Sequence, residues 1–395
     1  MRTAVVGDTR ASAGADARLS GRHVPQLDAL RTLAVASVAW VHWAPTRYHF
    51  GLPWGTGVQL FYVLSGFLIT GILLDVAPRA ELLSMSQRLG IWRRFYARRI
   101  LRIFPLFYAV LAVTLVLGID PIARTWHWHA AYLSNFYYFH LGHWGEPREP
   151  FRHLWSLSVE EQFYLVWPFL MLLAPRRAVW KILAAVIVLA PVFRAAVGLA
   201  IANPPMANAL PLSCLDALGI GSLLSYAVRF PIGGVKRAES LARWCLLVGL
   251  CGSALAGVVG HSRFENLFTD SVGHTCLVLL YGAVVYRAFA GFRGIAGRVL
   301  EWPVLVYPGK ISYGVYVMHL FVPLATVYAA NQMGMGGALA ASFPLQLAVN
   351  TLVTVMLAAL SWHLFELPLN NLKRFFPYAA AERAEGTAMA VEEVR

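Results

Sequence analysis

Two residues of the stretch LDALRTLAVASVAWVH, at positions 27–42, have the types and spacing for chemistry: Arg31 and His42. The stretch is otherwise apolar, and an ionisable side chain there is costly unless it faces a protein interior or a watery cavity. Eleven positions separate the two residues, so a helix would carry them on nearly the same face, about 16 Å apart along its axis. Because an imidazole can accept a proton near neutral pH, His42 is the candidate general base.

A second cluster lies in RRFYARRILRIFPLFY, at positions 93–108. Arg98, Arg99 and Arg102 stand at i, i+1 and i+4, so they crowd one side of a helix start. The planar guanidinium fork matches phosphate oxygens better than a point charge does. The three arginines, Arg99 and Arg102 above all, are therefore candidate phosphate-binding residues, whereas Arg93 and Arg94 are expected to set topology and touch anionic lipid.

The third cluster is HLWSLSVEEQFYLVWPFL, at positions 153–170, where Glu160 and Glu161 open an apolar run. Negative charge at a helix N-terminus is favourable in itself, and that alone could explain one carboxylate. Two adjacent carboxylates indicate a polar site, in which Glu160 or Glu161 would orient His42 as a carboxylate does in hydrolase triads.

The elements that hold these clusters are predicted to be membrane helices. With 58% hydrophobic and 13% charged residues and a mean hydropathy of +0.58, the chain is too apolar for an ordinary soluble protein. We expect an all-α polytopic membrane protein, with a polar cytoplasmic tail over residues 1–26, a membrane domain over 27–372 and a second tail over 373–395. About ten transmembrane helices are expected, beginning near Leu27, Gly55, Ile100, Glu160, Val179, Ala209, Leu241, Thr269, Lys310 and Leu345.

The placement of positive charge predicts the orientation of these helices. If both termini are cytoplasmic, nearly all of the 33 Lys and Arg residues fall on the inner side. Five would lie outside: Arg47, Arg124, Arg148, Arg152 and Arg263. This topology also explains the net charge of +13, so no nucleic-acid partner is expected and the partner surface is the lipid bilayer.

Residues 119–159 do not fit an eleventh span, because such a span would invert every later loop. We expect an external or interfacial segment there, with Trp and Tyr at the depth of the lipid headgroups. It carries four histidines, and a wet aromatic interface accounts for them better than a metal site: His127, His129, His140 and His143. No metal is expected.

Seven blocks of the chain resemble, in order, those of the acyltransferase 3 family of bacterial integral-membrane O-acyltransferases. They are LDALRTLAVASVAWVH, GVQLFYVLSGFLIT, FYARRILRIFPLFY, HLWSLSVEEQFYLVWP, LDALGIGSLL, ISYGVYVMHL and FELP, and the resemblance runs from about Leu27 to about Leu372. The Arg-x10-His motif of the family corresponds to Arg31 and His42, and its Arg-x-x-Arg motif to Arg99 and Arg102.

Small departures from the family pattern do not touch the motif residues. Gln59 stands where the family commonly has Asp, and Ala29 and Thr32 replace glycines often seen near the first motif.

The resemblance implies a multi-pass O-acyltransferase of the bacterial cytoplasmic membrane. Its co-substrate would be an acyl-coenzyme A, with acetyl as the expected group, and no cofactor would be bound permanently. In such a transfer His42 could, instead of acting as a base, become acylated itself. Arg31, a serine or a backbone amide are open candidates for stabilising the oxyanion. The acceptor would be a hydroxyl of a cell-envelope or exported carbohydrate. Two alternatives remain: an O-acyltransferase of an antibiotic such as a macrolide, and a polar-solute transporter, which would move its solute without consuming acyl-coenzyme A.

Overall fold

The computed structural model describes residues 23–50, 53–145, 149–200, 204–230, 233–259 and 269–378. These residues form helices and connections, with no strand among them. The predicted tails lie almost wholly outside the described residues. The main helices are α2 (Pro25–Trp43), α3 (Gly57–Val76), α4 (Met85–Val116), α5 (Ile122–Ala130), α6 (Ser134–Leu141), α7 (Trp155–Leu173), α8 (Arg176–Ala200), α9 (Leu215–Val228), α10 (Gly234–Val259), α12 (His274–Ala290), α13 (Gly294–Leu300), α14 (Pro303–Lys310), α15 (Ser312–Met318), α16 (Phe321–Gln332), α17 (Gly336–Ala341), α18 (Phe343–Ser361) and α19 (Leu367–Asn371).

Short helical turns connect the main helices. They are η1 (Thr46–Tyr48), η2 (Trp54–Thr56), η3 (Ala80–Leu82), η4 (Arg152–Leu154), η5 (Pro204–Ala209), η6 (Pro211–Cys214), η7 (Thr269–Gly273), η8 (Trp362–Glu366) and η9 (Leu372–Phe375).

Seven of the described segments are long and apolar enough to cross a membrane: Trp54–Val76, Met85–Val116, Arg176–Ala200, Pro211–Val228, Gly234–Gly257, Ser271–Ala290 and Phe343–Phe375. The pair α15 and α16, bent by 59° at the break between them, could form one more. The chain is therefore a multi-pass membrane protein. The two other predicted spans are α2 and α7, which are also helices of 19 residues, but their charged and amide side chains lower their hydropathy.

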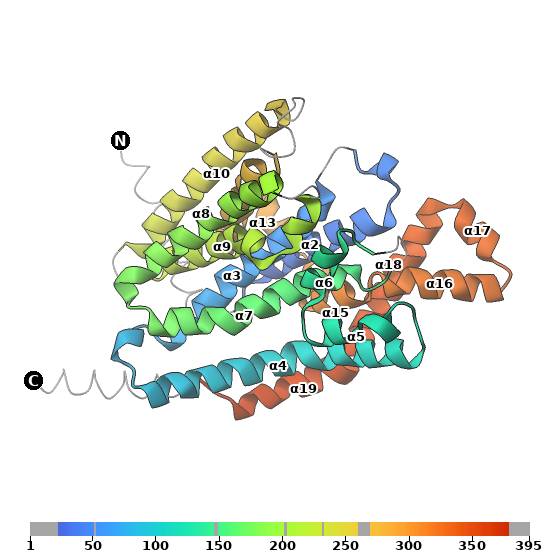
Figure 1. Cartoon of the computed structure of the whole chain (residues 1–395), viewed down its shortest axis with the longest axis horizontal. Helices are drawn as coiled ribbons and strands as arrows, with labels where there is room; N and C mark the ends of the chain where they lie inside the picture. Colours follow the sequence, from blue (N-terminus) through green and yellow to red (C-terminus); the bar gives the residue numbers. More distant parts are fainter. Residues whose placement is uncertain are drawn as a thin grey trace, which may run out of the picture.

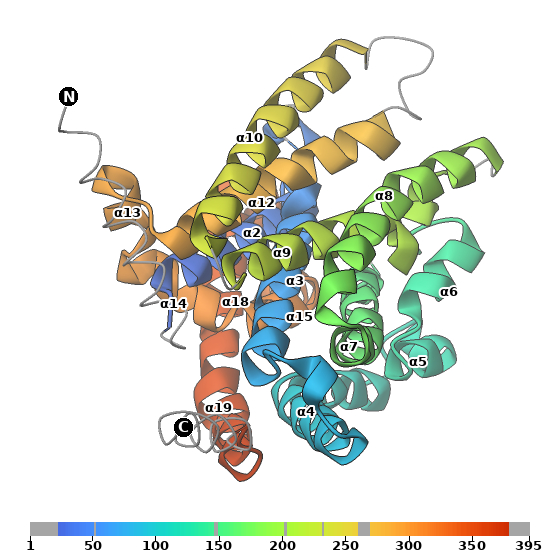
Figure 2. The same ribbon diagram turned by 90° about the vertical axis from the view of Figure 1, so that its left-hand side faces the viewer.

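Helices α3 and α9 form the centre of the bundle, and the others surround them (Figure 2). Their backbones approach closely because Gly66 and Gly221 lie at the crossing. A Cβ on Gly66 would lie 2.0 Å from the carbonyl oxygen of Leu218, and one on Gly221 would lie 2.0 Å from that of Val63. Small residues at such crossings are how membrane helices gain packing energy without a hydrophobic driving force. This rigid centre supports α2 and α7 on its flanks.

Helix α2 is fixed at both ends by side chains. The Gln26 amide donates to Phe292 O at 3.2 Å and accepts from Phe292 N at 2.8 Å. Thr32 Oγ1 donates to Leu305 O at 2.5 Å, and at the far end Trp43 Nε1 donates to His319 O at 2.8 Å. These bonds set the height and rotation of the helix that carries Arg31 and His42.

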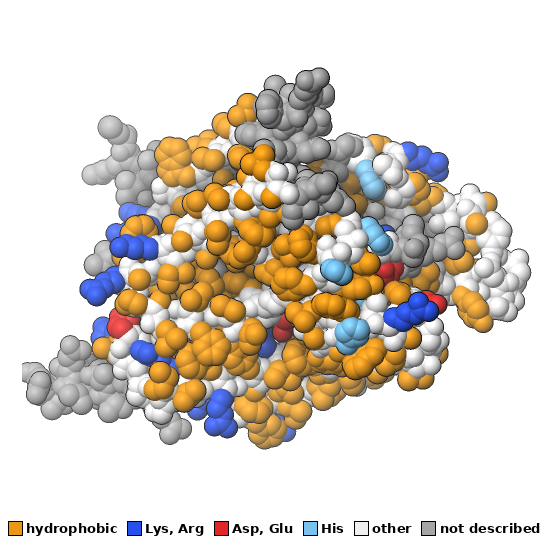
Figure 3. All heavy atoms as spheres, viewed as in Figure 1, with side chains coloured by type: hydrophobic (Ala, Val, Ile, Leu, Met, Phe, Trp, Pro, Cys, Tyr) orange, Lys and Arg blue, Asp and Glu red, His pale blue; other side chains and the backbone are white. Residues whose placement is uncertain are grey.

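One end of the bundle is basic, and we call it the basic end. There the ends of α3 and α9 meet, because Arg229 forms a two-pronged ion pair with Asp75, at 2.6 and 2.9 Å. The start of α8 joins them, with Arg176 lying 5.6 Å from the ring centre of Tyr226. Lys and Arg side chains gather along this edge, on the left of Figure 3, while hydrophobic side chains cover much of the face shown.

Helix α4 begins well before the predicted start of its span, because Ser84 and Gln87 form a capping box there. Beyond it, at the end of the bundle opposite the basic end, lie the short α5 and α6 (Figure 1). With 9 and 8 residues, neither can cross a bilayer.

Candidate active site

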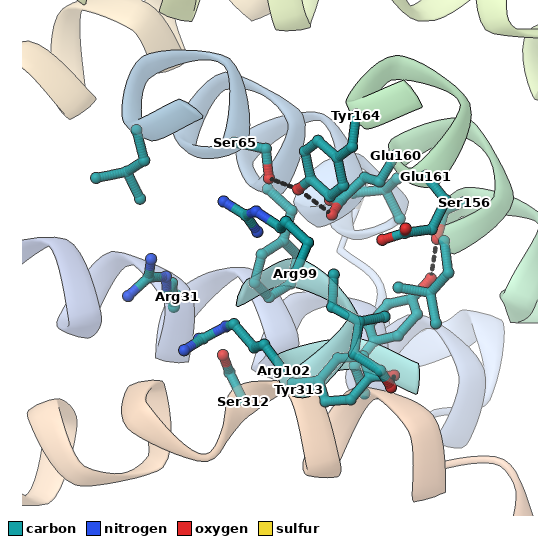
Figure 4. Close-up of a pocket in the computed structure, with 16 residues that line it drawn as sticks. Arg31, Ser65, Arg99, Arg102, Ser156, Glu160, Glu161, Tyr164, Ser312 and Tyr313 are labelled. Carbon is teal, nitrogen blue, oxygen red and sulfur yellow. Dashed lines mark hydrogen bonds between the residues drawn. The ribbon is translucent and has the colours of Figure 1, made fainter. Parts of the chain in front are cut away.

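Two cavities lie one above the other beside α2. The first, which we call the arginine cavity, encloses about 110 Å³ and takes residues from α2, α3, α4, α7 and α15. Its polar lining residues are Arg31, Ser65, Arg99, Arg102, Ser156, Glu160, Glu161, Tyr164, Ser312, Tyr313 and Tyr316. Figure 4 shows the guanidinium groups of Arg31, Arg99 and Arg102 on one side and both glutamates on the other. The two arginine motifs, far apart in the sequence, thus meet in one cavity.

The arginines of this cavity differ in how they are paired. Arg31 Nη1 forms an ion pair with Asp28 Oδ1 at 2.5 Å, and its side chain is 25% exposed. The guanidinium of Arg99 lies 4.6 Å from the ring centre of Tyr164. Within the described part of the chain, neither Arg99 nor Arg102 forms an ion pair. Their donors are therefore available to an anion that enters the cavity.

Arg98 does not line the arginine cavity. Its Nη1 donates to Lys373 O at 3.2 Å and to Phe376 O at 3.3 Å, and its guanidinium lies 5.0 Å from the ring centre of Tyr378. Arg98 thus holds the segment after α19 against α4, while Arg99 and Arg102 point into the cavity.

Glu160 and Glu161 belong to the arginine cavity, and His42 does not line it. The Tyr164 hydroxyl donates to Glu160 Oε2 at 2.7 Å and lies 2.9 Å from Ser65 Oγ. The sequence placed one of these carboxylates beside His42, whereas the structure gives His42 a different partner. The reason is packing: Glu160 and Glu161 lie one turn into α7, and only the start of that helix reaches the height of His42.

The second cavity, which we call the histidine cavity, encloses about 310 Å³. It is lined by Val38, Val41, His42, Gly55, Val58, Trp144, Arg152, His153, Trp155 and Tyr316. Val58 and Tyr316 also line the arginine cavity, so these two side chains form the wall between the two spaces.

His42 is oriented by His319. His42 Nδ1 lies 2.8 Å from His319 Nε2, and His319 Nδ1 lies 2.6 Å from Tyr316 O. A backbone carbonyl can only accept, so the hydrogen of an uncharged His319 is on Nδ1 and its Nε2 is an acceptor. His42 then donates from Nδ1 and keeps the lone pair on Nε2. This is the tautomer that a general base requires, set here by a second histidine and a backbone carbonyl.

Of the candidates for stabilising an oxyanion near His42, Arg31 is too far away. It is held by Asp28 in the arginine cavity, eleven residues before His42 on the same helix. Arg152 lines the histidine cavity together with His42, and an arginine keeps its charge at neutral pH. The sequence alone predicts Arg152 only as one of the external basic residues.

His319 and Arg152 are the residues that sequence reasoning missed. Both had weak signals: His319 is the second-to-last residue of the block ISYGVYVMHL, and Arg152 directly precedes the third cluster. Ser65 also gains a role as a neighbour of Tyr164. Among the described residues, no group of three or more His, Cys, Asp or Glu side chains has the arrangement of a metal site. Of the four histidines expected at a wet aromatic interface, His129 is instead buried, between Phe151 and Tyr138.

Comparison with known proteins finds relatives that are named as O-acetyltransferases. The chain is 27% identical over 383 residues to YrhL of Bacillus subtilis, which carries a provisional name as a peptidoglycan O-acetyltransferase; the match covers 89% of this chain and 55% of that protein. It is 34% identical over 176 residues to the peptidoglycan O-acetyltransferase OatA of Listeria monocytogenes, covering 39% of this chain and 25% of the relative. The O-acetyltransferase OatA of Staphylococcus aureus is 33% identical over 159 residues, covering 38% and 25%.

The chain thus spans about half the length of YrhL and a quarter of each OatA protein. No solved structure matches it significantly. The family model described as Acyltransferase domain matches residues 24–366, which include both arginine motifs, the glutamate pair and both histidines of the His42–His319 bond. The chain therefore belongs to the acyltransferase 3 family.

Proposed function

We propose that this chain is a membrane O-acyltransferase that moves an acyl group, acetyl in the first instance, from acyl-coenzyme A to a hydroxyl of a cell-envelope carbohydrate. The observation that carries the proposal is an oriented histidine in one cavity beside a second cavity, in which Arg99 and Arg102 form no ion pair with any described residue. The names of the relatives support an acetyl donor and a glycan acceptor.

The donor would enter the arginine cavity from the basic end. By the rule that cytoplasmic loops carry the excess of Lys and Arg, that end faces the cytoplasm, where acyl-coenzyme A is made. Arg99 and Arg102 would bind its phosphates, because two planar forks in a partly dehydrated site bind phosphate more strongly than they would at a surface. The pantetheine arm would then pass between Val58 and Tyr316 toward His42.

The chemistry would take place at the wall between the cavities. His42 Nε2 removes the proton of the acceptor hydroxyl while the hydroxyl oxygen attacks the thioester carbonyl. Arg152 stabilises the oxyanion that develops on the carbonyl oxygen. The C–S bond then breaks, the proton on His42 passes to the departing sulfur, and the products are an ester and the free thiol of coenzyme A.

His319 acts in this proposal as a positioning residue. It holds His42 in the tautomer with a free Nε2 and accepts the hydrogen bond from Nδ1 throughout the reaction. Its own partner, Tyr316 O, belongs to the helix that ends at the break between α15 and α16, so the backbone of that break sets the position of the base.

The test uses purified protein in detergent, acetyl-coenzyme A and glycan prepared from cell envelope, with release of coenzyme A thiol followed over time. We expect release to depend on the glycan and to fall about 10²- to 10⁴-fold in His42→Ala. His363→Ala is the matched control, since His363 contacts Tyr307 and lines neither cavity. Mass spectrometry of the glycan should show added acetyl groups. Near-normal turnover by His42→Ala, or no thiol release by folded wild-type protein, would refute the proposal.

A further inference from the structure

Two tryptophans line the histidine cavity together with His42. Trp144 follows α6 and Trp155 begins α7, and their ring centres lie 5.4 Å apart with an angle of 39° between the planes. Both side chains are partly exposed. Together they form one aromatic wall, which we call the tryptophan wall. Nothing in the donor path described above uses it.

The cavity around this wall is large enough for a small ring-shaped ligand. Its volume of about 310 Å³ is at the lower end of the range of ligand pockets, roughly 300–1,000 Å³. Apart from the tryptophans, its lining combines aliphatic side chains with a few polar groups, among them His42, Arg152 and the Tyr316 ring. Apolar walls with a few convergent polar groups are what a binding site for an orientable ligand requires.

A sugar ring matches this combination. One of its faces is made of C–H groups, which carry partial positive charge and pack on the negative face of an aromatic ring. Its rim carries hydroxyl and acetamido oxygens, which can accept hydrogen bonds from the guanidinium of Arg152. A lipid chain has no groups for Arg152, and the pantetheine arm is a flexible chain without a flat face.

We propose that the tryptophan wall is the acceptor subsite and binds one sugar ring of a glycan strand, with one hydroxyl directed at His42. This inference rests on the proposed function, since it names where the acceptor of that reaction binds. It places donor and acceptor on opposite sides of the wall formed by Val58 and Tyr316. The ester would then form where the two cavities meet.

The experiment compares Trp144→Ala and Trp155→Ala with Trp126→Ala. Trp126 is 46% exposed on α5, contacts His127 and does not line the cavity, so it controls for loss of a tryptophan at the same end of the molecule. The acceptor is a tetrasaccharide of alternating N-acetylglucosamine and N-acetylmuramic acid. We expect the apparent KM for the tetrasaccharide to rise about 3- to 10-fold in each wall variant. The KM for acetyl-coenzyme A should stay within about 2-fold, as both constants should in Trp126→Ala.

Two further measurements test whether the aromatic faces cause the change in KM and whether that change reflects binding. Trp144→Phe and Trp155→Phe should recover most of the acceptor affinity, because phenylalanine keeps an aromatic face where alanine has none. Binding of the tetrasaccharide to His42→Ala protein, measured by saturation-transfer NMR titration, should weaken by a similar factor when either tryptophan is replaced by alanine. This measurement needs no turnover, so it separates failure of the subsite from failure of the proposed reaction.

The inference is overturned if the wall variants keep the wild-type KM for the tetrasaccharide, or if they raise the KM for acetyl-coenzyme A instead, which would assign the cavity to the donor arm. It is also overturned if wild-type protein does not bind the tetrasaccharide. Binding that depends on the wall but without any transfer would leave the subsite standing and refute the proposed reaction.

Discussion

Two regions of the bundle contain arginines inside apolar helices, and the arginines have different partners in the two regions. In the first, Arg194 of α8 is 4% exposed and surrounded by acceptors. Its Nη2 lies 2.6 Å from Asp216 Oδ2, 2.9 Å from Ser271 O and 2.7 Å from Thr275 Oγ1, and its Nη1 donates to Ser213 O. Here a charge inside the membrane domain has a counter-ion and carbonyl acceptors.

In the second region, Arg99 and Arg102 line the arginine cavity, and neither forms an ion pair within the described residues. Glu160 and Glu161 line the same cavity, but they form no ion pair with either arginine. The role of an arginine in an apolar helix therefore follows from its partners. Arg194, which has a counter-ion, joins helices. Arg99 and Arg102, which line a cavity and form no ion pair with a described residue, are available for a ligand.

The largest expected effect concerns the ion pair between Arg194 and Asp216. Asp216→Ala leaves Arg194 buried without its counter-ion, and we expect the free energy of unfolding to fall by about 3–5 kcal/mol. Thermal unfolding in detergent measures it. The double variant Arg194→Met with Asp216→Leu should recover most of the loss, because a pair of apolar side chains replaces a pair of charges. If Asp216→Ala unfolds at the same temperature as the wild type, the pair of Arg194 and Asp216 does not hold α8 to α9.

Substitution of Arg99 and Arg102 should weaken binding of the donor and leave the free energy of unfolding nearly unchanged. In Arg99→Ala with Arg102→Ala, we expect the apparent KM for acetyl-coenzyme A to rise about 100-fold, because charge-assisted bonds to phosphate are lost. The free energy of unfolding should change little. Arg98→Ala is the matched control and should keep that KM within about 2-fold, since Arg98 contacts the segment after α19. A double variant with an unchanged KM would reassign both arginines to topology.

The smallest expected effect concerns His319. Replacing it with Leu should lower kcat about 10- to 100-fold with little change in either KM, because His42 loses the acceptor that orients it. His319→Gln should recover most of the rate, since its amide can donate to Tyr316 O and accept from His42 Nδ1. Steady-state kinetics separate the two constants. Equal losses in the Leu and Gln variants would make His319 structural only.

Local features of the fold could be predicted from the sequence. All ten predicted spans correspond to helical segments, since apolar runs of sufficient length are visible without tertiary information. Two other features were not visible. The capping box at Ser84 extends α4 far beyond its apolar part, and the predicted span near Lys310 breaks between Met318 and Phe321.

The site could be predicted only within single helices. The spacing of Arg31 and His42, or of Arg99 and Arg102, follows from helix geometry. The bond from His42 to His319 joins residues 277 positions apart and depends on how α2 packs against α15. For the same reason Glu160 and Glu161, predicted beside His42, lie in the arginine cavity: the relative height of two helices is a property of their packing.

The measurement that tests the central claim most directly separates the two substrates by a membrane. Proteoliposomes would contain acetyl-coenzyme A labelled in the acetyl group, with glycan tetrasaccharide outside only, and wild-type protein would be compared with His42→Ala. We expect labelled glycan outside the proteoliposomes, in an amount that depends on His42, because donor and acceptor are proposed to enter from opposite ends and to meet where the two cavities adjoin. Labelled glycan formed only when both substrates share one side would contradict it.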